Sequence, residues 1–371
     1  MPVSHNGIAL PWSGRPFEAS LFDSGCRRFI ILKMISKNKI ITQMNKQGYR
    51  FIGPQGAVKI CRWTKKSLNG EGCCYKEKFY GIKSHKCCQV TPWLGCDNKC
   101  LHCWRAIEFD FNNFNKNKIT KPQEFIQESI QFQRKLLQGF KKDPKSKKKQ
   151  LSKADQFLWK EAQEPDQFAI SLSGEPTIYP YIGEFIQELR KQDKTSFLVT
   201  NGLHPLILKE LYKKNQLPTQ LYVSVNSSNK KDYLPFHRSQ IKQPWKKLNS
   251  SLELLPKLNK KTRTVFRINL IKDLNMSDKN INEFAELIKK SQARFIELKG
   301  FMSVGFARKR LGYNRMPYHE DIKEFAKKLE KQLNKIDVKY KILDEHYFSR
   351  AIVLGNSKTG KKDLKIKKKE V

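Results

Sequence analysis

The sequence has no run of about 18 apolar residues, the length that a membrane-spanning helix needs. It is also poor in acid: 35 Asp and Glu stand against 73 Lys and Arg, a formal net charge of +38. An excess of this size favours a polyanionic partner, with nucleic acid first and a membrane surface second. Much of the excess is lysine, so composition bias contributes to it. The N-terminus lacks the basic, apolar and small-residue segments of a secretory signal, and we expect a cytoplasmic protein.

Disulfides are not indicated, because the nine cysteines are odd in number and eight of them are crowded between Cys61 and Cys103. Cys96, Cys100 and Cys103 have C-x3-C-x2-C spacing. A reducing compartment works against a disulfide here, and three thiolates in one loop suit an iron–sulfur cluster with one open iron. A structural zinc site with a fourth ligand from elsewhere is the alternative.

A second cysteine series precedes this loop. Cys61, Cys74 and Cys87 are separated by twelve residues each time, and Cys73 and Cys88 adjoin members of the series. Taken alone, the series is more simply explained as three buried thiols, as free cysteines often are. Beside a loop that favours a cluster, it suggests a second open cluster.

Strand-like and helix-like stretches alternate from residue 88 onward. Strands are expected over 88–95, 167–174, 196–202, 220–226, 264–270 and 295–300. Helices are expected over 122–138, 181–192, 205–215, 244–258, 279–290 and 320–334. This alternation predicts β-α units around a parallel sheet. We therefore predict an α/β protein: a partial (β/α)6 barrel of the TIM-like type, with the cysteine loop after its first strand and a cysteine-rich N-terminal extension.

The chain divides into four expected parts. Residues 1–44 would be a disordered extension or a start-site artefact, 45–87 the cysteine segment, 88–355 the barrel and 356–371 a basic tail, disordered from residue 357. A lysine-rich insert over 139–153 is either a solvated loop or a contact for RNA.

Polar residues and glycines follow four of the expected strands. Because a barrel of this type has its site at the C-terminal ends of the strands, these residues predict one shared site. They are Ser173–Thr177, Thr200–Gly202, Ser224–Ser227 and Glu297–Gly300.

Seven segments, in this order, resemble one family. They are 74–87, 96–105, 171–180, 198–202, 220–225, 295–302 and 304–311. The C-x3-C-x2-C loop is similar to that of the radical S-adenosylmethionine (SAM) enzymes. The whole set resembles the 4-demethylwyosine synthases, radical-SAM enzymes of tRNA wyosine biosynthesis, in the form without a flavodoxin-like domain. The resemblance spans about residues 45–355.

The resemblance implies an enzyme that condenses N1-methylguanosine-37 of tRNA(Phe) with two carbons from pyruvate to form 4-demethylwyosine. It implies SAM and two [4Fe–4S] clusters, the radical-SAM cluster on Cys96, Cys100 and Cys103. The auxiliary cluster would be on Cys61, Cys74 and Cys87. Expected partners are the tRNA, pyruvate and a separate electron donor, with the protein acting as a monomer away from membranes.

Individual roles follow from the same resemblance. Glu175 is expected to receive the amino group of SAM, with a helix N-terminal acid as the alternative. Asn201 and Asn226 are candidates for its carboxylate and ribose hydroxyls. His102, where such loops usually carry an aromatic residue, is expected to stack on the adenine. Lys299 is the candidate for a Schiff base with pyruvate, which needs a lowered amine pKa; a surface lysine is the alternative.

RNA contacts are expected from basic and aromatic side chains near the last strand. Phe306 or Tyr313 would stack on bases. The phosphates would meet Arg105, Arg308, Lys309 and Arg310.

Two other functions are alternatives. The first is another radical-SAM enzyme that modifies RNA or activates a protein, which the regular second cysteine series disfavours. The second is a zinc-stabilised nucleic-acid-binding protein that uses the same thiolates.

Overall fold

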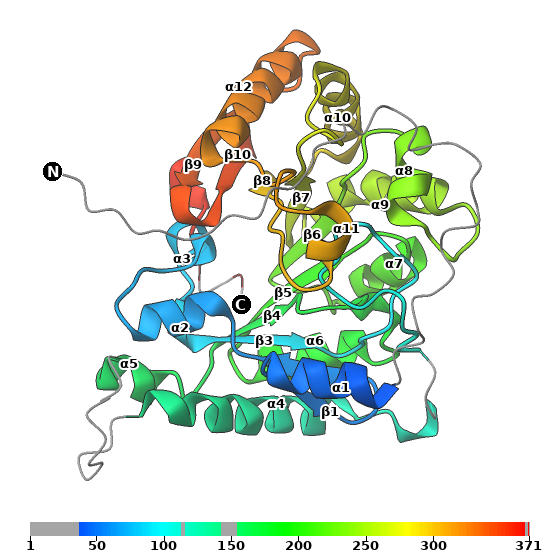
Figure 1. Ribbon diagram of the computed structural model, residues 1–371. Coiled ribbons are helices and arrows are strands. Elements are labelled where there is room, and N and C mark those ends of the chain that lie inside the picture. Colours follow the sequence, from blue (N-terminus) through cyan, green and yellow to red (C-terminus); the bar gives the residue numbers. More distant parts are fainter. Residues whose placement is uncertain (1–36, 113–115, 142–153, 368–369, 371) are drawn as a thin grey trace, which may run out of the picture.

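One ten-stranded sheet runs through the molecule in the order β1-β2-β3-β4-β5-β6-β7-β8-β10-β9 (Figure 1). The structure is a computed structural model and describes residues 37–112, 116–141, 154–367 and 370. The strands are β1 Tyr49–Ile52, β2 Gly56–Lys59, β3 Cys87–Thr91, β4 Gln167–Ile170, β5 Thr195–Thr200, β6 Gln220–Ser224, β7 Arg263–Leu270, β8 Phe295–Gly300, β9 Tyr340–His346 and β10 Ala351–Asn356. The α-helices are α1 Lys37–Lys46, α2 Arg62–Leu68, α3 Tyr75–Tyr80, α4 Pro122–Leu137, α5 Gln156–Glu161, α6 Ile182–Lys191, α7 Pro205–Lys213, α8 Lys230–His237, α9 Pro244–Leu258, α10 Asp278–Ser291, α11 Ala307–Leu311 and α12 His319–Lys335.

The six central strands, β3 to β8, are parallel, and antiparallel strands flank them on both sides. Within the described residues the edge strands β1 and β9 do not pair with each other, so the barrel stays open. This arrangement confirms the predicted partial (β/α)6 barrel. None of the described helices is long and apolar enough to cross a membrane.

All six expected strands and all six expected helices are present, with ends that differ by at most four residues. The largest differences lie where polar residues leave β3 and β4 to form the site. The sequence did not predict the four flanking strands. Charged residues interrupt Tyr340–His346, and the other three strands have only four to six residues, so none shows a sustained alternation that marks a strand.

Part of the predicted N-terminal disorder is wrong. Residues 37–44 belong to α1, whose Ile40 and Met44 are buried against the barrel. Residues 1–36 lie outside the described part, as do 142–153 of the lysine-rich insert. The boundary between 45–87 and 88–355 stays a prediction, although β1 and β2 join the same sheet as the barrel.

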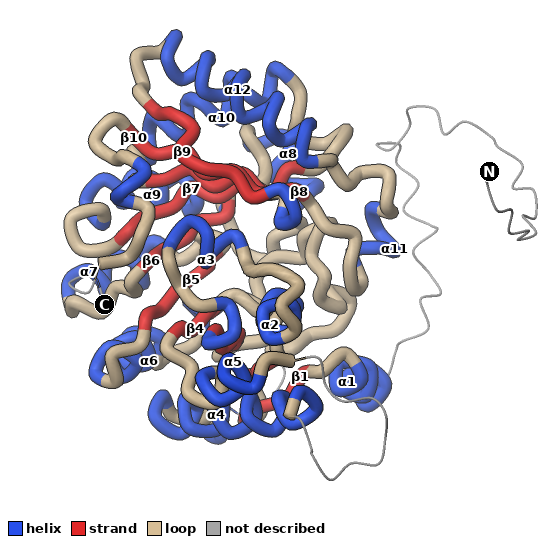
Figure 2. Tube along the Cα trace, turned by 90° about the vertical axis from the view of Figure 1, so that its left-hand side faces the viewer, coloured by secondary structure: helices blue, strands red, loops and turns tan. Residues whose placement is uncertain are grey.

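Alternate residues of the strands face two different layers. Leu198 on β5 and Leu298 on β8 pack in the large outer core, which the barrel helices cover. Phe197 and Phe295, on the same two strands but on their other face, point inward and pack with Tyr80 of α3. Helix α3 therefore fills the inside of the open barrel, where Figure 2 shows it in front of the strands.

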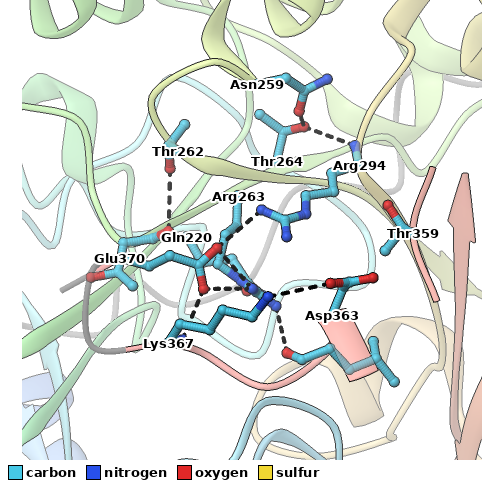
Figure 3. A network of polar contacts seen from close by, with 12 residues as sticks. Gln220, Asn259, Thr262, Arg263, Thr264, Arg294, Thr359, Asp363, Lys367 and Glu370 are labelled. Atoms are coloured by element: carbon cyan, nitrogen blue, oxygen red, sulfur yellow. Dashed lines mark hydrogen bonds and ion pairs between the residues drawn. The ribbon is translucent and has the colours of Figure 1, made fainter. Parts of the chain in front are cut away.

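The C-terminal segment fastens the N-terminal ends of the strands (Figure 3). Arg263 opens β7 and is 1% exposed. Its guanidinium donates to Glu370 at 3.0 Å, to Gln220 Oε1 at 3.0 Å and to the Leu364 carbonyl. Arg294 reaches the same carboxylate at 3.1 Å. The predicted disorder of the tail is therefore wrong for its described part, because two arginines hold it.

We expect Glu370→Ala to lower the free energy of unfolding by about 2 kcal/mol at pH 7, because a buried guanidinium loses its anionic partner. Burial raises the pKa of Glu370, but the Lys367 backbone N–H and the charges of Arg263 and Arg294 outweigh it, so the pKa lies below 4.5. The carboxylate therefore stabilises the fold above its unfolded pKa, and this contribution disappears as pH falls through the folded pKa.

Urea unfolding at pH 7 and at pH 3 measures the effect, which should shrink in acid. Glu253→Ala is the control, because its pair with Lys290 is exposed and worth less than about 1 kcal/mol. Equal losses in the two variants at pH 7 would contradict the fastening role of the tail.

Candidate functional site

The cysteine loop follows β3 and lies against the ends of the next strands. The backbone N–H of Asn98 donates to Cys96 Sγ at 3.4 Å, and the amide of Asn201 lies 3.9 Å from the same sulfur. His237, at the end of α8, places Nδ1 3.1 Å from Cys100 Sγ. Burial raises the pKa of both thiols, so their thiolate forms require nearby cations.

Arg105 supplies that positive charge. It is 7% exposed and donates to the carbonyls of Asn98 at 2.9 Å and Leu94 at 3.4 Å. Burial lowers the pKa of Arg105, but the thiols of Cys103 and Cys96 outweigh it and raise the pKa. The sequence predicted a phosphate contact for Arg105; the structure instead turns its guanidinium inward, toward the thiols.

A glycine brings the end of β4 directly onto the loop. Gly174 has φ +72°, and a Cβ there would lie 2.0 Å from the Trp93 carbonyl oxygen. The following N–H, of Glu175, donates to the Gly95 carbonyl at 2.7 Å. Only glycine allows this approach, which sets the position of the chain just before the first cysteine.

Glu175 is 1% exposed, and its carboxylate joins β4 to β5. Oε1 accepts from Thr177 N at 3.1 Å, from Thr177 Oγ1 at 2.6 Å and from Thr200 Oγ1 at 2.7 Å, and Oε2 accepts from Asn201 N at 2.7 Å. Burial raises the pKa of Glu175 and outweighs these donors. Three of these donors share Oε1, and only the Asn201 N–H reaches Oε2. Glu175 thus positions the backbone of Asn201, and Oε2 keeps an acceptor site for the predicted amino group.

His102 and Asn226 meet at the same rim. The ring of His102 stacks on Phe236 with centroids 5.1 Å apart and planes 5° apart, and Nε2 lies 3.3 Å from Asn226 Nδ2. Asn226 Oδ1 accepts from Asn269 N at 2.9 Å. Burial lowers the pKa of His102 to about 4, so the ring is neutral at pH 7. The structure thus gathers all four predicted SAM residues at the cysteine loop; their roles stay predictions.

Two buried ring nitrogens beside the loop, His102 Nδ1 and His237 Nε2, have no hydrogen-bond partner among the described residues. A buried polar atom without a partner is costly. These atoms suit a site that a bound group completes.

The second cysteine series also converges. Burial and then Cys61 raise the pKa of Cys74, and burial, Cys61 and Cys74 raise that of Cys87. Cys88 points to the opposite face of β3, into the outer core, and the pKa of Cys73 responds to no other thiol. The charges of the three thiols predicted from the spacing therefore influence one another, and a cluster on these three rather than on Cys73 or Cys88 stays a prediction.

The chemistry of both sets fits a cluster. Among the described residues, no three Cys, His, Asp or Glu side chains converge closely enough to share one metal ion. Thiolates of a four-iron cluster bind different irons and therefore stand farther apart than the ligands of a single zinc.

Glu297 connects this second set to the barrel wall. It is fully buried on β8 and accepts hydrogen bonds from Tyr75 OH at 2.9 Å and Tyr80 OH at 3.2 Å. Arg267 on β7 pairs with it at 3.3 Å. Because Tyr75 follows Cys74 directly, this carboxylate fixes the start of α3 and the thiol beside it.

Lys299 lies two residues after Glu297 on β8, so both side chains face the same side of the sheet. Its Nζ donates to the Ser349 carbonyl at 2.9 Å and stands 5.2 Å from the Tyr75 ring centroid. Burial and then Arg267 lower its pKa to about 8, against the opposite effect of Glu297 and Cys74. The structure therefore places the predicted amine beside the second thiol set, with the lowered pKa that a Schiff-base lysine needs.

The sequence reasoning missed a second amine at this place. Lys76 on α3 is 7% exposed, and its Nζ lies 5.1 Å from the Phe197 ring centroid and 5.3 Å from that of Tyr222. Its charge lowers the pKa of Cys74 and Cys87. The only sequence signal was a lysine two residues after a cysteine of the series, in a lysine-rich chain.

The other basic residues predicted to bind RNA divide into two groups. Arg308 and Lys309 on α11 are exposed, and the Arg308 guanidinium lies 5.0 Å from the Tyr313 ring centroid. Arg310 instead turns toward the cysteine loop, where it donates to the carbonyls of Leu101 at 3.1 Å and Cys103. Its position supports the loop, and phosphate contact stays a prediction only for the exposed pair.

Comparisons with known proteins agree with this geometry. The family model of the radical SAM superfamily matches residues 90–285, and the model described as wyosine base formation matches 290–356. A tRNA 4-demethylwyosine synthase of Pyrococcus abyssi is 41% identical over 317 residues, covering 85% of this chain and 88% of the relative. The Homo sapiens synthase TYW1 is 35% identical over 318 residues, covering 85% of this chain and 40% of the relative.

Solved structures match over nearly the whole fold. Archaeal TYW1 has a TM-score of 0.68 at 30% identity and covers 90% of this chain and 100% of its own. TYW1 with a lysine–pyruvate adduct bound has a TM-score of 0.73 at 31% identity; the match covers 88% of this chain and 98% of the TYW1 chain. The chain belongs to the radical-SAM family of tRNA 4-demethylwyosine synthases.

Proposed function

We propose that the protein is a SAM-dependent tRNA 4-demethylwyosine synthase, which condenses N1-methylguanosine-37 of tRNA(Phe) with two carbons from pyruvate. The carrying observation is that Cys96 and Cys100 stand at the rim of the barrel, whereas Cys74 directly precedes helix α3 on the inner face, next to the Tyr75 ring that lies 5.2 Å from Lys299 Nζ. The relatives that share the family carry this activity in their names, and one TYW1 structure holds a lysine–pyruvate adduct.

Each thiol set would hold one [4Fe–4S] cluster, the first on Cys96, Cys100 and Cys103. When bound there, the cluster supplies the electron that cleaves SAM to a 5′-deoxyadenosyl radical. Arg105 balances the thiolate charge, and His102 and Asn226 flank the loop where SAM would lie. Glu175 acts by fixing the backbone of Asn201. The second cluster would be on Cys61, Cys74 and Cys87.

On the inner face, Lys299 would hold pyruvate as an imine near the second thiol set, and Glu297 keeps this amine and Cys74 in register. The target base must leave the stack of the anticodon loop to enter the barrel, which costs little in an unpaired loop. A separate electron donor, a monomeric state and a cytoplasmic location stay predictions from the sequence.

The activity itself is the first test. Protein reconstituted with iron and sulfide under nitrogen should convert tRNA that carries N1-methylguanosine, in the presence of SAM, pyruvate and dithionite. Mass spectrometry of the nucleosides should show the tricyclic base, and no product should form without pyruvate. Cleavage of SAM without the tricyclic base would refute the proposed substrates.

Iron content tests the two cluster sites separately. The wild type should bind about 8 irons per chain, and the triple variant Cys61→Ala, Cys74→Ala, Cys87→Ala about 4, because one four-iron cluster is lost. The triple variant should still cleave SAM but make no tricyclic base. Cys73→Ala is the matched control and should keep all the iron. Loss of iron in this control, or a colourless zinc protein, would contradict the assignment.

The pH dependence of adduct formation tests Lys299. Imine formation requires the neutral amine, so borohydride trapping of labelled pyruvate should rise with pH, pass its midpoint near the pKa of about 8 and then level off. An ordinary lysine would keep rising to about pH 10.4. Peptide mapping should place the label on Lys299. Lys299→Arg should abolish it and Lys76→Arg should retain it; a label on Lys76 would transfer the role to that residue.

A further inference from the structure

An aromatic turn stands at the mouth of the barrel, beside the proposed pyruvate site. The turn is the 3-10 segment Tyr347–Ser349 between β9 and β10, strands that Figure 1 places next to α3. Tyr347 is 58% exposed. Phe348 is 81% exposed, which is more than any other large hydrophobic residue in the described part of the chain. Their ring planes are nearly perpendicular, at 89° and 5.6 Å. Water is a poor environment for such side chains, so this exposure suggests a partner.

The turn is rigidly held and tied to Lys299. The Ser349 N–H donates to His346 Nδ1 at 3.1 Å, and the Ser349 carbonyl accepts from Lys299 Nζ at 2.9 Å. On either side, the Trp63 ring packs on His346 at 5.6 Å, and the His319 ring packs on Tyr347 at 5.1 Å. Whatever stacks on the turn therefore sits next to the place where the target base reacts.

Cations lie beside an aromatic ring close to the turn. Tyr318, which is 64% exposed and precedes His319, has the Lys272 amine 5.0 Å and the Arg350 guanidinium 5.5 Å from its ring centroid. Lys272 is paired with Asp321, whereas Arg350 donates to the Pro317 carbonyl at 2.8 Å and forms no ion pair with a described carboxylate. Exposed aromatic rings beside cations are the pattern by which proteins bind single-stranded nucleic acid.

We infer that Phe348 stacks on an unpaired nucleotide of the RNA loop adjacent to the target base, with Tyr347 against its edge and Arg350 toward its phosphate. This inference rests on the proposed function. It adds a protein contact that would keep the RNA loop open at the mouth of the barrel. Base–aromatic stacking has little sequence preference, so this contact recognises an extruded loop rather than a particular base.

Binding of a labelled anticodon stem-loop that contains N1-methylguanosine tests the inference by fluorescence anisotropy. The experiment uses the reconstituted holoenzyme with SAM, without reductant. Phe348→Ala should weaken binding by about 10-fold, because stacking contributes about 1–3 kcal/mol per base. Phe348→Trp should restore it. Phe157→Ala, which removes another exposed phenylalanine (70% exposed) on α5, is the control and should bind as the wild type does.

The salt dependence separates stacking from charge. Phe348→Ala should keep the slope of log affinity against log salt, whereas Arg350→Met should lower it by about one phosphate contact. Unchanged affinity in Phe348→Ala, beside a wild type that binds, would overturn the inference and leave the proposed function intact. Failure of the wild type to bind would overturn both. A dimer that dissociates in Phe348→Ala at unchanged RNA affinity would identify the turn as a protein interface and also overturn the inference.

Discussion

Glu297 is buried inside the barrel, and the position of the cysteine segment depends on it. Its carboxylate receives two tyrosine hydroxyls from α3 and the guanidinium of Arg267 from β7. A charge buried this deeply is tolerated only when it is paired and hydrogen-bonded, so the strand and the helix must stay in one relative position. Tyr75 follows Cys74, and Lys299 is two residues from Glu297 on the same strand face. One ion pair thus sets the distance between the amine and the thiols.

The rim is organised largely by hydrogen bonds and close packing that involve the backbone. Gly174 packs on the Trp93 carbonyl, and Glu175 then binds the end of β5 through Thr200 and Asn201. These contacts join the ends of β3, β4 and β5 without any substrate group. Arg105 and Arg310 brace the loop from the other side through carbonyl oxygens. These contacts hold the backbone of the cysteine loop from two sides.

Much of this was accessible from the sequence. The two cysteine spacings indicated the two thiol sets and a strand end indicated Lys299, whose roles stay predictions. Alternating strands and helices and the polar strand ends predicted the barrel, because each leaves a local pattern. Features that depend on long-range packing left none. The contact of Glu297 with α3 is an example, because Glu297 and Tyr75 are 222 residues apart in the sequence. Likewise, nothing local distinguishes Arg105, turned inward, from Arg308, turned outward. Lys76 was lost among the lysines for the same reason.

The two amines at the inner face are unequal, and the difference follows from what lies near them. Burial, and then the permanent charge of the neighbouring Arg267, lower the pKa of Lys299 to about 8. Lys76 instead faces the rings of Phe197 and Tyr222, which attract a cation, and the thiols of Cys74 and Cys87, which its charge helps to ionise. The lowered pKa that a Schiff-base lysine needs is therefore found at Lys299, whose role stays a prediction. Since Glu297 pairs with Arg267 at 3.3 Å, the same carboxylate that docks the cysteine segment also holds a charge that lowers the pKa of Lys299.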